Sequence, residues 1–207
     1  MAKILIVRHG RTEFNDARKF CGITDIDMSP DGYRQIEKVR DRLARQKIDM
    51  VFCSDLKRAR VSAEIITAGR NLEIKTVPEL REMDYGRCET MTWDEISQNY
   101  PDITENMIKR SRDIDFPEGE SLNDLASRIS KFAGVLKQCP PEQTVLVVGH
   151  SGPLGVLVCT LLEIGIELFW RFYIDNASLS IVNIYPDFAI LNLLNDVSHL
   201  EEFGDVK

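Results

Sequence analysis

Three short runs of apolar residues, each ending at polar or charged residues, limit most strongly what this chain can fold into. The runs are ILIV at 4–7, MVFC at 50–53 and VLVV at 145–148. A continuous apolar run of this length is typical of a strand that is buried on both faces, as in a parallel sheet. Residues 74–77 form a weaker candidate strand, which ends at Pro78.

Helical patterns separate these runs. Ser29 followed by Pro30 indicates a helix start, with a capping serine and a proline at the first helical position. Ser121 with Asp124 resembles a capping box, and apolar residues follow at helical spacing. Further helices are predicted for 56–68 and 153–162, and a hairpin for 180–185 with 189–194. Alternating buried strands and amphipathic helices predict the α/β class, as a three-layer α/β/α sandwich with a mostly parallel central sheet.

Composition argues against several kinds of partner. The formal net charge of −7 disfavours nucleic acid or an acidic membrane surface as the main partner. The five cysteines are scattered, with no CxxC pair and no ligand spacing to a histidine, so we expect reduced thiols and no bound metal. The first apolar run is too short for a signal peptide, and no later stretch approaches a membrane span. The cytoplasm is the expected location.

Groups that can act on a phosphate follow the predicted strands, at the sheet edge where open α/β folds bind ligands. Arg8 and His9 follow the first run, Arg58 the second, Glu82 the weaker strand and His150 the last. Guanidinium groups bind phosphate bidentately, and neutral imidazole is a competent nucleophile. A carboxylic acid beside a phosphate dianion keeps its proton more readily, because like charge raises its pKa. The set therefore favours phosphoryl transfer.

The sequence resembles the histidine phosphatase superfamily, which has the phosphoglycerate mutase-like fold. The resemblance spans residues 3–155 through VRHGRTEFN at 7–15, TDIDMSPDG at 24–32, SDLKRA at 54–59, LREMDYG at 80–86 and GHSG at 149–152. The short chain is more similar to the phosphatase branch than to the longer mutases. PEGESL at 117–122 resembles a PGGES-type segment of α-ribazole phosphatases, although Glu118 replaces the usual glycine.

The resemblance implies a role for each matching residue. His9 would be phosphorylated in a covalent intermediate, and Glu82 would donate a proton to the leaving group. Arg8, Arg58 and His150 would hold the phosphate oxygens and stabilise their charge in the transition state. The catalytic candidates are therefore His9, Glu82, His150, Arg8 and Arg58.

Three further residues are predicted to bind phosphate or substrate. Asn15 matches a phosphate-binding position, Thr12 one that assists phosphate binding or orients the histidine, and Ser151 lies in the last motif. The family needs no metal, and no cofactor is expected. The implied substrate is a small phosphorylated metabolite, with α-ribazole 5′-phosphate and a sugar phosphate as the named possibilities. A homo-oligomer is compatible with the sequence.

The predicted domain organisation is one histidine phosphatase domain over residues 1–207. Residues 85–120 are polar and turn-rich, and we predict an insertion over the active site, with an ordinary surface excursion as the alternative. The acidic segment 196–207 is predicted to be a peripheral tail.

Three other functions are compatible with parts of the pattern. A cofactor-dependent phosphoglycerate mutase would share the phosphohistidine step. GHSGP at 149–153 nearly matches the nucleophile elbow of α/β-hydrolases, which would make Ser151 an esterase nucleophile with His199 and either Asp187 or Asp196. A binding module that has lost catalysis is the third, although His9 and His150 are both retained.

Overall fold

A six-stranded sheet forms the centre of the computed structural model, which describes residues 1–203. The strands are β1 (Ala2–Arg8), β2 (Met50–Cys53), β3 (Ile74–Thr76), β4 (Thr144–Gly149), β5 (Leu179–Ile184) and β6 (Ala189–Asp196). Their order across the sheet is β3-β2-β4-β1-β5-β6. The first four in that order are parallel, whereas β5 and β6 form the antiparallel hairpin predicted from the sequence.

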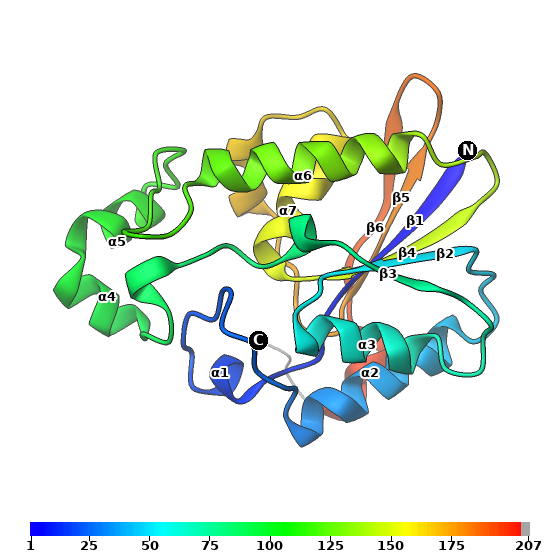
Figure 1. Ribbon diagram of the computed structural model, residues 1–207, viewed down its shortest axis with the longest axis horizontal. Coiled ribbons are helices and arrows are strands. Elements are labelled where there is room, and N and C mark those ends of the chain that lie inside the picture. The colour runs from blue at the N-terminus through cyan, green and yellow to red at the C-terminus, as the bar shows by residue number, and fades with distance from the viewer. Residues whose placement is uncertain (204–207) are drawn as a thin grey trace.

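Helices cover both faces of the sheet, which confirms the three-layer α/β/α prediction (Figure 1). Helices α2 (Pro30–Leu43) and α3 (Lys57–Ile66) lie on one face, and α6 (Leu122–Lys137) and α7 (Ser151–Leu161) on the other. Successive side chains of a strand point to opposite faces. Accordingly, Ile4 and Ile6 belong to the core beneath α6 and α7, whereas Leu5 and Val7 belong to the core beneath α2 and α3.

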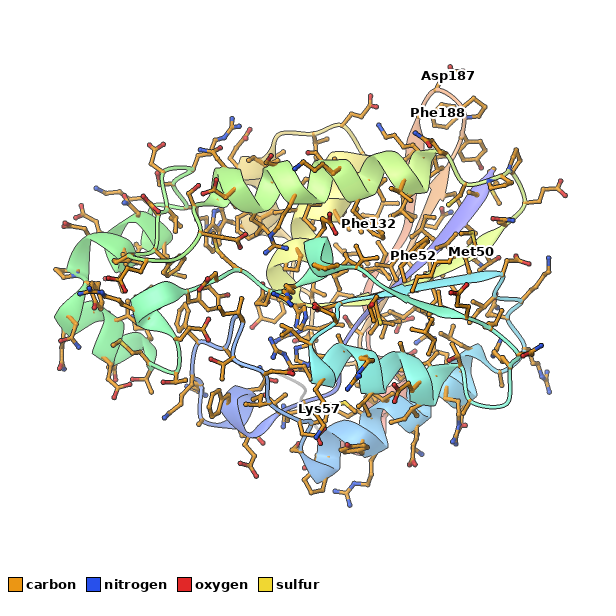
Figure 2. All side chains as sticks on the ribbon, viewed as in Figure 1. Met50, Phe52, Lys57, Phe132, Asp187 and Phe188 are labelled. Atoms are coloured by element: carbon orange, nitrogen blue, oxygen red, sulfur yellow. The ribbon has the colours of Figure 1, made fainter. Side chains whose placement is uncertain are left out.

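Local sequence signals fix the helix starts. Ser29 accepts a hydrogen bond from the Gly32 N–H and precedes Pro30, the first residue of α2. Ser121 and Asp124 form a reciprocal capping box at the start of α6. Phe132 of α6 then meets Phe52 of β2 edge-to-face, with ring centroids 5.5 Å apart (Figure 2). The aromatic pair joins this helix to the sheet.

Residues 85–120 contain more regular structure than their polar composition indicated. They include the short 3₁₀ helix η2 (Gly86–Cys88) and the α-helices α4 (Trp93–Asn99) and α5 (Pro101–Ile108). These helices lie beyond the carboxyl ends of the parallel strands rather than along a sheet edge (Figure 1). Backbone hydrogen bonds from Thr90 to Phe20 and from Phe20 to Met91 tie the segment to the loop after α1 (Glu13–Asp16).

The prediction of a peripheral tail from residue 196 is wrong for the part of that segment that the structure describes. Asp196 ends β6, and the 3₁₀ helix η4 (Ser198–Phe203) packs against α2. Leu200 is fully buried among the apolar side chains of that layer. Arg42 of α2 forms an ion pair with Asp196 and a 2.9 Å hydrogen bond with Nδ1 of His199. Residues 204–207 lie outside the described residues.

We expect Leu200→Ala to lower the free energy of unfolding by about 2–5 kcal/mol, because it removes a fully buried side chain and leaves a cavity. Glu201→Ala is the matched control, since Glu201 is the next residue and is exposed. Denaturant unfolding measures both. If both variants lowered the free energy of unfolding by the same small amount, Leu200 would not contribute to the core and the prediction of a peripheral tail would stand.

Two other structural elements complete the description. The 3₁₀ helices η1 (Pro78–Leu80) and η3 (Ile166–Arg171) lie in the loops after β3 and α7.

Within residues 1–203, no helix is both long enough and apolar enough to cross a membrane. The same residues contain no group of three or more His, Cys, Asp or Glu side chains that could hold a metal ion.

Candidate active site

The carboxyl ends of the parallel strands bring the predicted catalytic residues together. Arg8 is the last residue of β1 and His9 follows it, His150 follows β4, and Arg58 lies in the first turn of α3 after β2. Arg8, His9, Arg58 and Glu82 line one pocket of about 420 Å³. His150 is fully buried beside it, with its ring centroid 5.0 Å from that of His9.

His9 is held in one orientation and one tautomer. Its Nδ1 lies 2.7 Å from the Gly10 carbonyl oxygen. Because a carbonyl only accepts, Nδ1 carries the proton and Nε2 retains its lone pair. Burial, and then the charges of Arg58 and Arg8, hold the pKa of His9 well below its ordinary value of 6.5. His9 is therefore neutral at neutral pH, with Nε2 available as a nucleophile.

The backbone around His9 is fixed from several directions. The N–H of His9 donates to the Gly149 carbonyl, and that of Ala177 lies 3.1 Å from both the Arg8 and the His9 carbonyl oxygens. Asn176 adds a side-chain hydrogen bond of 3.2 Å to the His9 carbonyl. Residues 176–177 connect η3 with β5, and sequence reasoning did not identify them. No pattern around them signals a contact to β1.

The two arginines are positioned by backbone carbonyl groups. Arg58 is 1% exposed and donates to the carbonyl oxygens of Gly22 and Thr24 at 2.7 and 2.8 Å. Arg8 donates through Nη1 to the Ile174 carbonyl at 2.7 Å. Carbonyl groups orient a guanidinium group without neutralising it, so both arginines keep a full positive charge for an anion.

Several buried polar atoms at the pocket have no hydrogen-bond partner within the protein. They are Nε of Arg8 and both ring nitrogens of His150. Burial, together with the charges of Arg58 and Arg8, holds the pKa of His150 well below its ordinary value of 6.5. Buried polar groups are normally paired. Unpaired nitrogens beside two cationic side chains favour binding of an oxyanion.

Glu82 supplies a buried carboxyl group on the same pocket. Its two oxygens accept hydrogen bonds from the N–H groups of Met83 at 2.9 Å and Gly152 at 3.3 Å. Burial raises its pKa above the usual 4.5, although the Met83 hydrogen bond and the charge of Arg8 partly oppose this. A carboxyl group in this state holds a proton more readily than an exposed one, as a general acid requires.

Arg128 of α6 fixes the chain on either side of Glu82. It donates to the carbonyl oxygens of Arg81 at 2.7 Å and Glu82 at 3.0 Å. Two further hydrogen bonds of 2.8 Å join it to the Glu120 carboxylate. Sequence reasoning missed Arg128, because an arginine on an amphipathic helix is usually a surface charge.

We expect Gly152→Ala to displace the Glu82 carboxyl group, since a β-carbon at residue 152 would lie 2.6 Å from Glu82 Oε1. The predicted result is a loss of about 100-fold in kcat/KM for alkyl phosphates, the scale expected for a catalytic group misplaced by about 1 Å. Gly134→Ala in α6 is the control, because a β-carbon there meets no atom within 4 Å. If Gly152→Ala and Gly134→Ala had the same kcat/KM for alkyl phosphates, Gly152 would not be needed to position Glu82.

Thr12 and Asn15 also line the pocket, but they face each other in a capping box. Asn15 Oδ1 accepts hydrogen bonds of 3.0 Å from both the N–H and the hydroxyl of Thr12. Asn176 donates to the same oxygen at 3.2 Å. Asn15 Nδ2 is left as a donor for a ligand, whereas the Thr12 hydroxyl is used to hold the turn.

The structure argues against the esterase alternative. Ser151 begins α7 and lines the pocket, but the ring nitrogens of His199 contact Arg42 and the Ala177 carbonyl instead of Ser151. Asp196 pairs with Arg42, and Asp187 lies at the tip of the β5–β6 hairpin (Figure 2). No Ser-His-Asp triad therefore forms among these residues.

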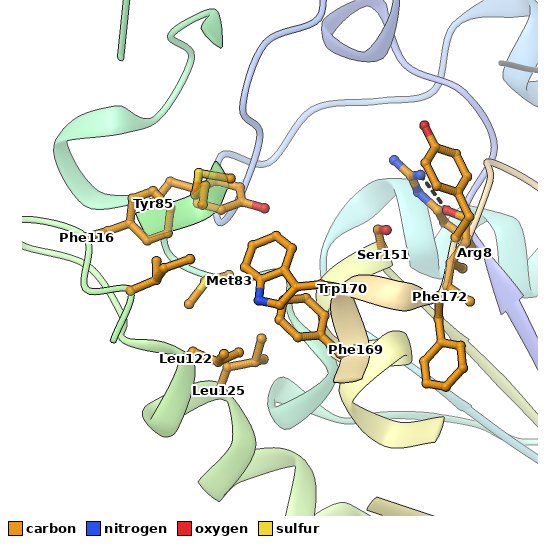
Figure 3. A pocket seen from close by; sticks show the side chains of 15 residues that line it. Arg8, Met83, Tyr85, Phe116, Leu122, Leu125, Ser151, Phe169, Trp170 and Phe172 are labelled. Atoms are coloured by element: carbon orange, nitrogen blue, oxygen red, sulfur yellow. Dashed lines mark hydrogen bonds between the residues drawn. The ribbon is translucent and has the colours of Figure 1, made fainter. Parts of the chain in front are cut away.

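A second pocket, of about 300 Å³, adjoins the first and shares Arg8, Tyr85, Ser151 and Tyr173 with it (Figure 3). Its walls are mostly apolar and include Phe116, which meets Tyr85 edge-to-face with ring centroids 5.0 Å apart.

The doubly wound fold and this collection of side chains define a class: enzymes that transfer phosphoryl groups by way of a histidine. The chain belongs to the histidine phosphatase superfamily (branch 1), whose family profile matches residues 4–197.

Relatives and solved structures are similar over nearly the whole chain. Phosphoserine phosphatase 1 of Hydrogenobacter thermophilus is 31% identical over 98% of this chain and 96% of its own length. A "Probable phosphoglycerate mutase GpmB" of Serratia proteamaculans is 32% identical over 97% and 96%. The crystal structure of the α-ribazole phosphatase from Shigella flexneri has a TM-score of 0.87 at 26% identity, covering 94% of this chain and 96% of that one.

These comparisons confirm the family, the phosphatase class and the phosphoglycerate mutase-like fold predicted from the sequence. The chain is an enzyme that acts on a small phosphorylated substrate. The roles of individual residues stay predictions, which the geometry above supports.

Proposed function

We propose that this phosphatase hydrolyses phosphomonoesters through a phosphohistidine at His9. The observation that carries the proposal is the neutral His9 ring, whose Nδ1 is bound to the Gly10 carbonyl, in a pocket that also contains the guanidinium groups of Arg8 and Arg58. The free Nε2 lone pair and the cationic surroundings provide the nucleophile and the anion site that this reaction needs.

In the first step, His9 Nε2 attacks phosphorus, a nitrogen–phosphorus bond forms and the bond to the ester oxygen breaks. Glu82 gives its proton to the departing alkoxide. Arg8, Arg58 and His150 bind the phosphate oxygens and stabilise the charge that they carry in the transition state. The buried, raised-pKa carboxyl of Glu82 supports its assignment as the acid.

In the second step, water attacks phosphorus while the Glu82 carboxylate accepts one of its protons. The nitrogen–phosphorus bond breaks, inorganic phosphate leaves, and His9 and Glu82 return to their starting states. Apart from substrate and water, every group in this proposed cycle is a side chain of this protein, and no cofactor is invoked. Asn15 Nδ2 and Ser151 are assigned to phosphate or substrate binding, and Thr12 to holding the turn that carries Asn15.

Segment 85–120 is assigned as a cap over the bound substrate. Tyr85, Met107, Ile114 and Phe116 from this segment line the apolar pocket beside the phosphate pocket. Cytoplasmic location is retained as part of the proposal, supported by five cysteines that are all unpaired. Fractionation of cells that produce the protein tests the location.

Mutase activity is the second candidate, because a 32% identical relative carries that name. A substrate panel separates the two activities: α-ribazole 5′-phosphate, O-phosphoserine, fructose bisphosphates and the phosphoglycerates, with phosphate release and product isomers both followed. Phosphate release without isomerisation supports the phosphatase. Interconversion of 2- and 3-phosphoglycerate would replace it with the mutase.

A further inference from the structure

The apolar pocket adjoins the pocket that contains His9 and offers space for the leaving group of a bound phosphomonoester. It shares Arg8, Tyr85, Ser151 and Tyr173 with the pocket that contains His9. A substrate whose phosphate lies at His9 therefore has direct access to this second space. Its volume of about 300 Å³ is at the lower end of the range for small-molecule sites.

Three separate parts of the chain build the apolar walls. Met107 and Ile114 come from the segment 85–120, Leu125 from α6 and Trp170 from η3. Figure 3 shows Trp170 projecting toward Leu125 across the pocket. Apolar side chains from distant segments that converge on one space favour an apolar ligand, because they bind by removing its surface from water.

Charge in this pocket is restricted to its border with the phosphate site. Among the lining residues that the structure describes, only Arg8 is charged, and Arg8 is assigned to the phosphate. The carboxylate and ammonium groups of phosphoserine, or the carboxylate of a phosphoglycerate, would be desolvated here without a counter-charge. Burying an unpaired charge is strongly unfavourable.

We propose that the preferred substrates are phosphomonoesters of an alcohol with an apolar ring, and that the ring binds in this pocket. The inference rests on the proposed phosphohistidine mechanism and adds the class of leaving group. It distinguishes this chain from its relatives that are named for phosphoserine or phosphoglycerate, although the overall similarity to them is high.

Two cationic side chains at the phosphate pocket, which we call the cationic rim, could favour acidic substrates instead. Arg18 and Lys19 line the phosphate pocket but not the apolar one. An acidic substrate that extends toward these side chains, away from Trp170, would be favoured by their charge. The experiment must therefore compare apolar and acidic leaving groups that depart as the same kind of alkoxide.

Three esters of primary alcohols provide that comparison: ethyl phosphate, 2-phenylethyl phosphate and O-phosphoserine. Each releases a primary alkoxide, so each needs the acid in a comparable way, and they differ in the group on the second carbon. We expect kcat/KM for 2-phenylethyl phosphate to exceed that for ethyl phosphate by about 100-fold, from burial of the ring. We expect O-phosphoserine to be no better a substrate than ethyl phosphate.

Neighbouring residues of α5 supply a matched pair of variants. Met107 lines the pocket, whereas Ile108 is 71% exposed and does not. Met107→Lys places a charge against the ring and is expected to lower the ratio of the kcat/KM values for the phenylethyl and ethyl esters at least tenfold, on the order of the discrimination that a buried apolar contact provides. Ile108→Lys is expected to leave both values unchanged.

Binding without turnover provides an independent measurement. The chain has two tryptophans, and Trp93 lies outside the pocket, so Trp93→Phe leaves Trp170 as the reporter. We expect 3-phenylpropylphosphonate, a non-hydrolysable analogue of the phenylethyl ester, to change the fluorescence of Trp170. Propylphosphonate should produce a smaller change.

The outcomes separate the two proposals. Equal kcat/KM for the phenylethyl and ethyl esters, or a Met107→Lys variant that folds and keeps the wild-type ratio, overturns the apolar leaving group but leaves the phosphohistidine mechanism in place. A preference of tenfold or more for O-phosphoserine over ethyl phosphate also overturns the apolar leaving group, and it would assign substrate specificity to Arg18 and Lys19. Failure to hydrolyse any ester, with no phosphate trapped on His9, overturns the mechanism itself.

Discussion

Replacing His9 with alanine is expected to lower kcat/KM by about 10⁴- to 10⁶-fold for every phosphomonoester, the scale seen when a nucleophile is removed. His150, whose ring centroid lies 5.0 Å from that of His9, is assigned to hold the phosphate oxygens, so we expect it not to replace His9 as the attacking group. Steady-state phosphate release measures the loss. Rapid quenching with a ³²P-labelled substrate should label the wild-type protein and leave the variant unlabelled.

The alanine variant needs a control for folding, since His9 is buried and its ring contacts His150. Thermal unfolding followed by circular dichroism should show a cooperative transition for both proteins. A folded His9→Ala protein with more than one hundredth of the wild-type activity would end the assignment of His9 as nucleophile.

Glu82→Gln is expected to show the second largest effect, and its size should depend on the leaving group. For ethyl phosphate, we expect kcat/KM to fall by about 10²- to 10⁴-fold, the usual contribution of general acid catalysis. For p-nitrophenyl phosphate the loss should be less than about tenfold, because a stable phenolate leaves without a proton. Equal losses on the two esters would remove Glu82 from the acid role.

The pH dependence tests the same residue. The acid is active only while it is protonated, so the wild-type kcat/KM for ethyl phosphate should fall as the pH rises through the pKa of Glu82, which burial raises above 4.5. Glutamine does not titrate, and the variant should lose this descending limb. The lowered pKa of His9 keeps its ring neutral from neutral pH to below 6.5, so protonation of His9 should limit the rate only at lower pH.

The sequence predicted the positions of those catalytic residues that lie next to a predicted strand. Arg8 ends a buried strand and His9 directly follows it, so their position at the sheet edge can be predicted from the strand pattern alone. The hairpin and the capped helices also follow from local signals, since each depends on residues within a few positions of one another.

Contacts between residues far apart in the sequence could not be predicted from local patterns. Arg128 meets the Glu82 backbone across 46 residues, and nothing in its helical pattern shows that contact. Leu200 is fully buried although it lies in an acidic segment, and the nearby ion pair between Arg42 and Asp196 is equally invisible in the sequence. Trp170 and Leu125 line the same apolar pocket only because η3 and α6 both pack against α7, on the same side of the sheet.

The position of β1 in the sheet has a consequence for biosynthesis. β1 is made first, yet both of its neighbours are made late: Lys3 pairs with Thr144 of β4, and Ile4 pairs with Val182 of β5. A nascent chain that ends before residue 144 therefore carries an apolar strand with both edges open, the condition that favours aggregation. Catalytic competence must appear abruptly and late in translation, once the ribosome has released the segment that holds the carbonyl groups of Arg8 and His9.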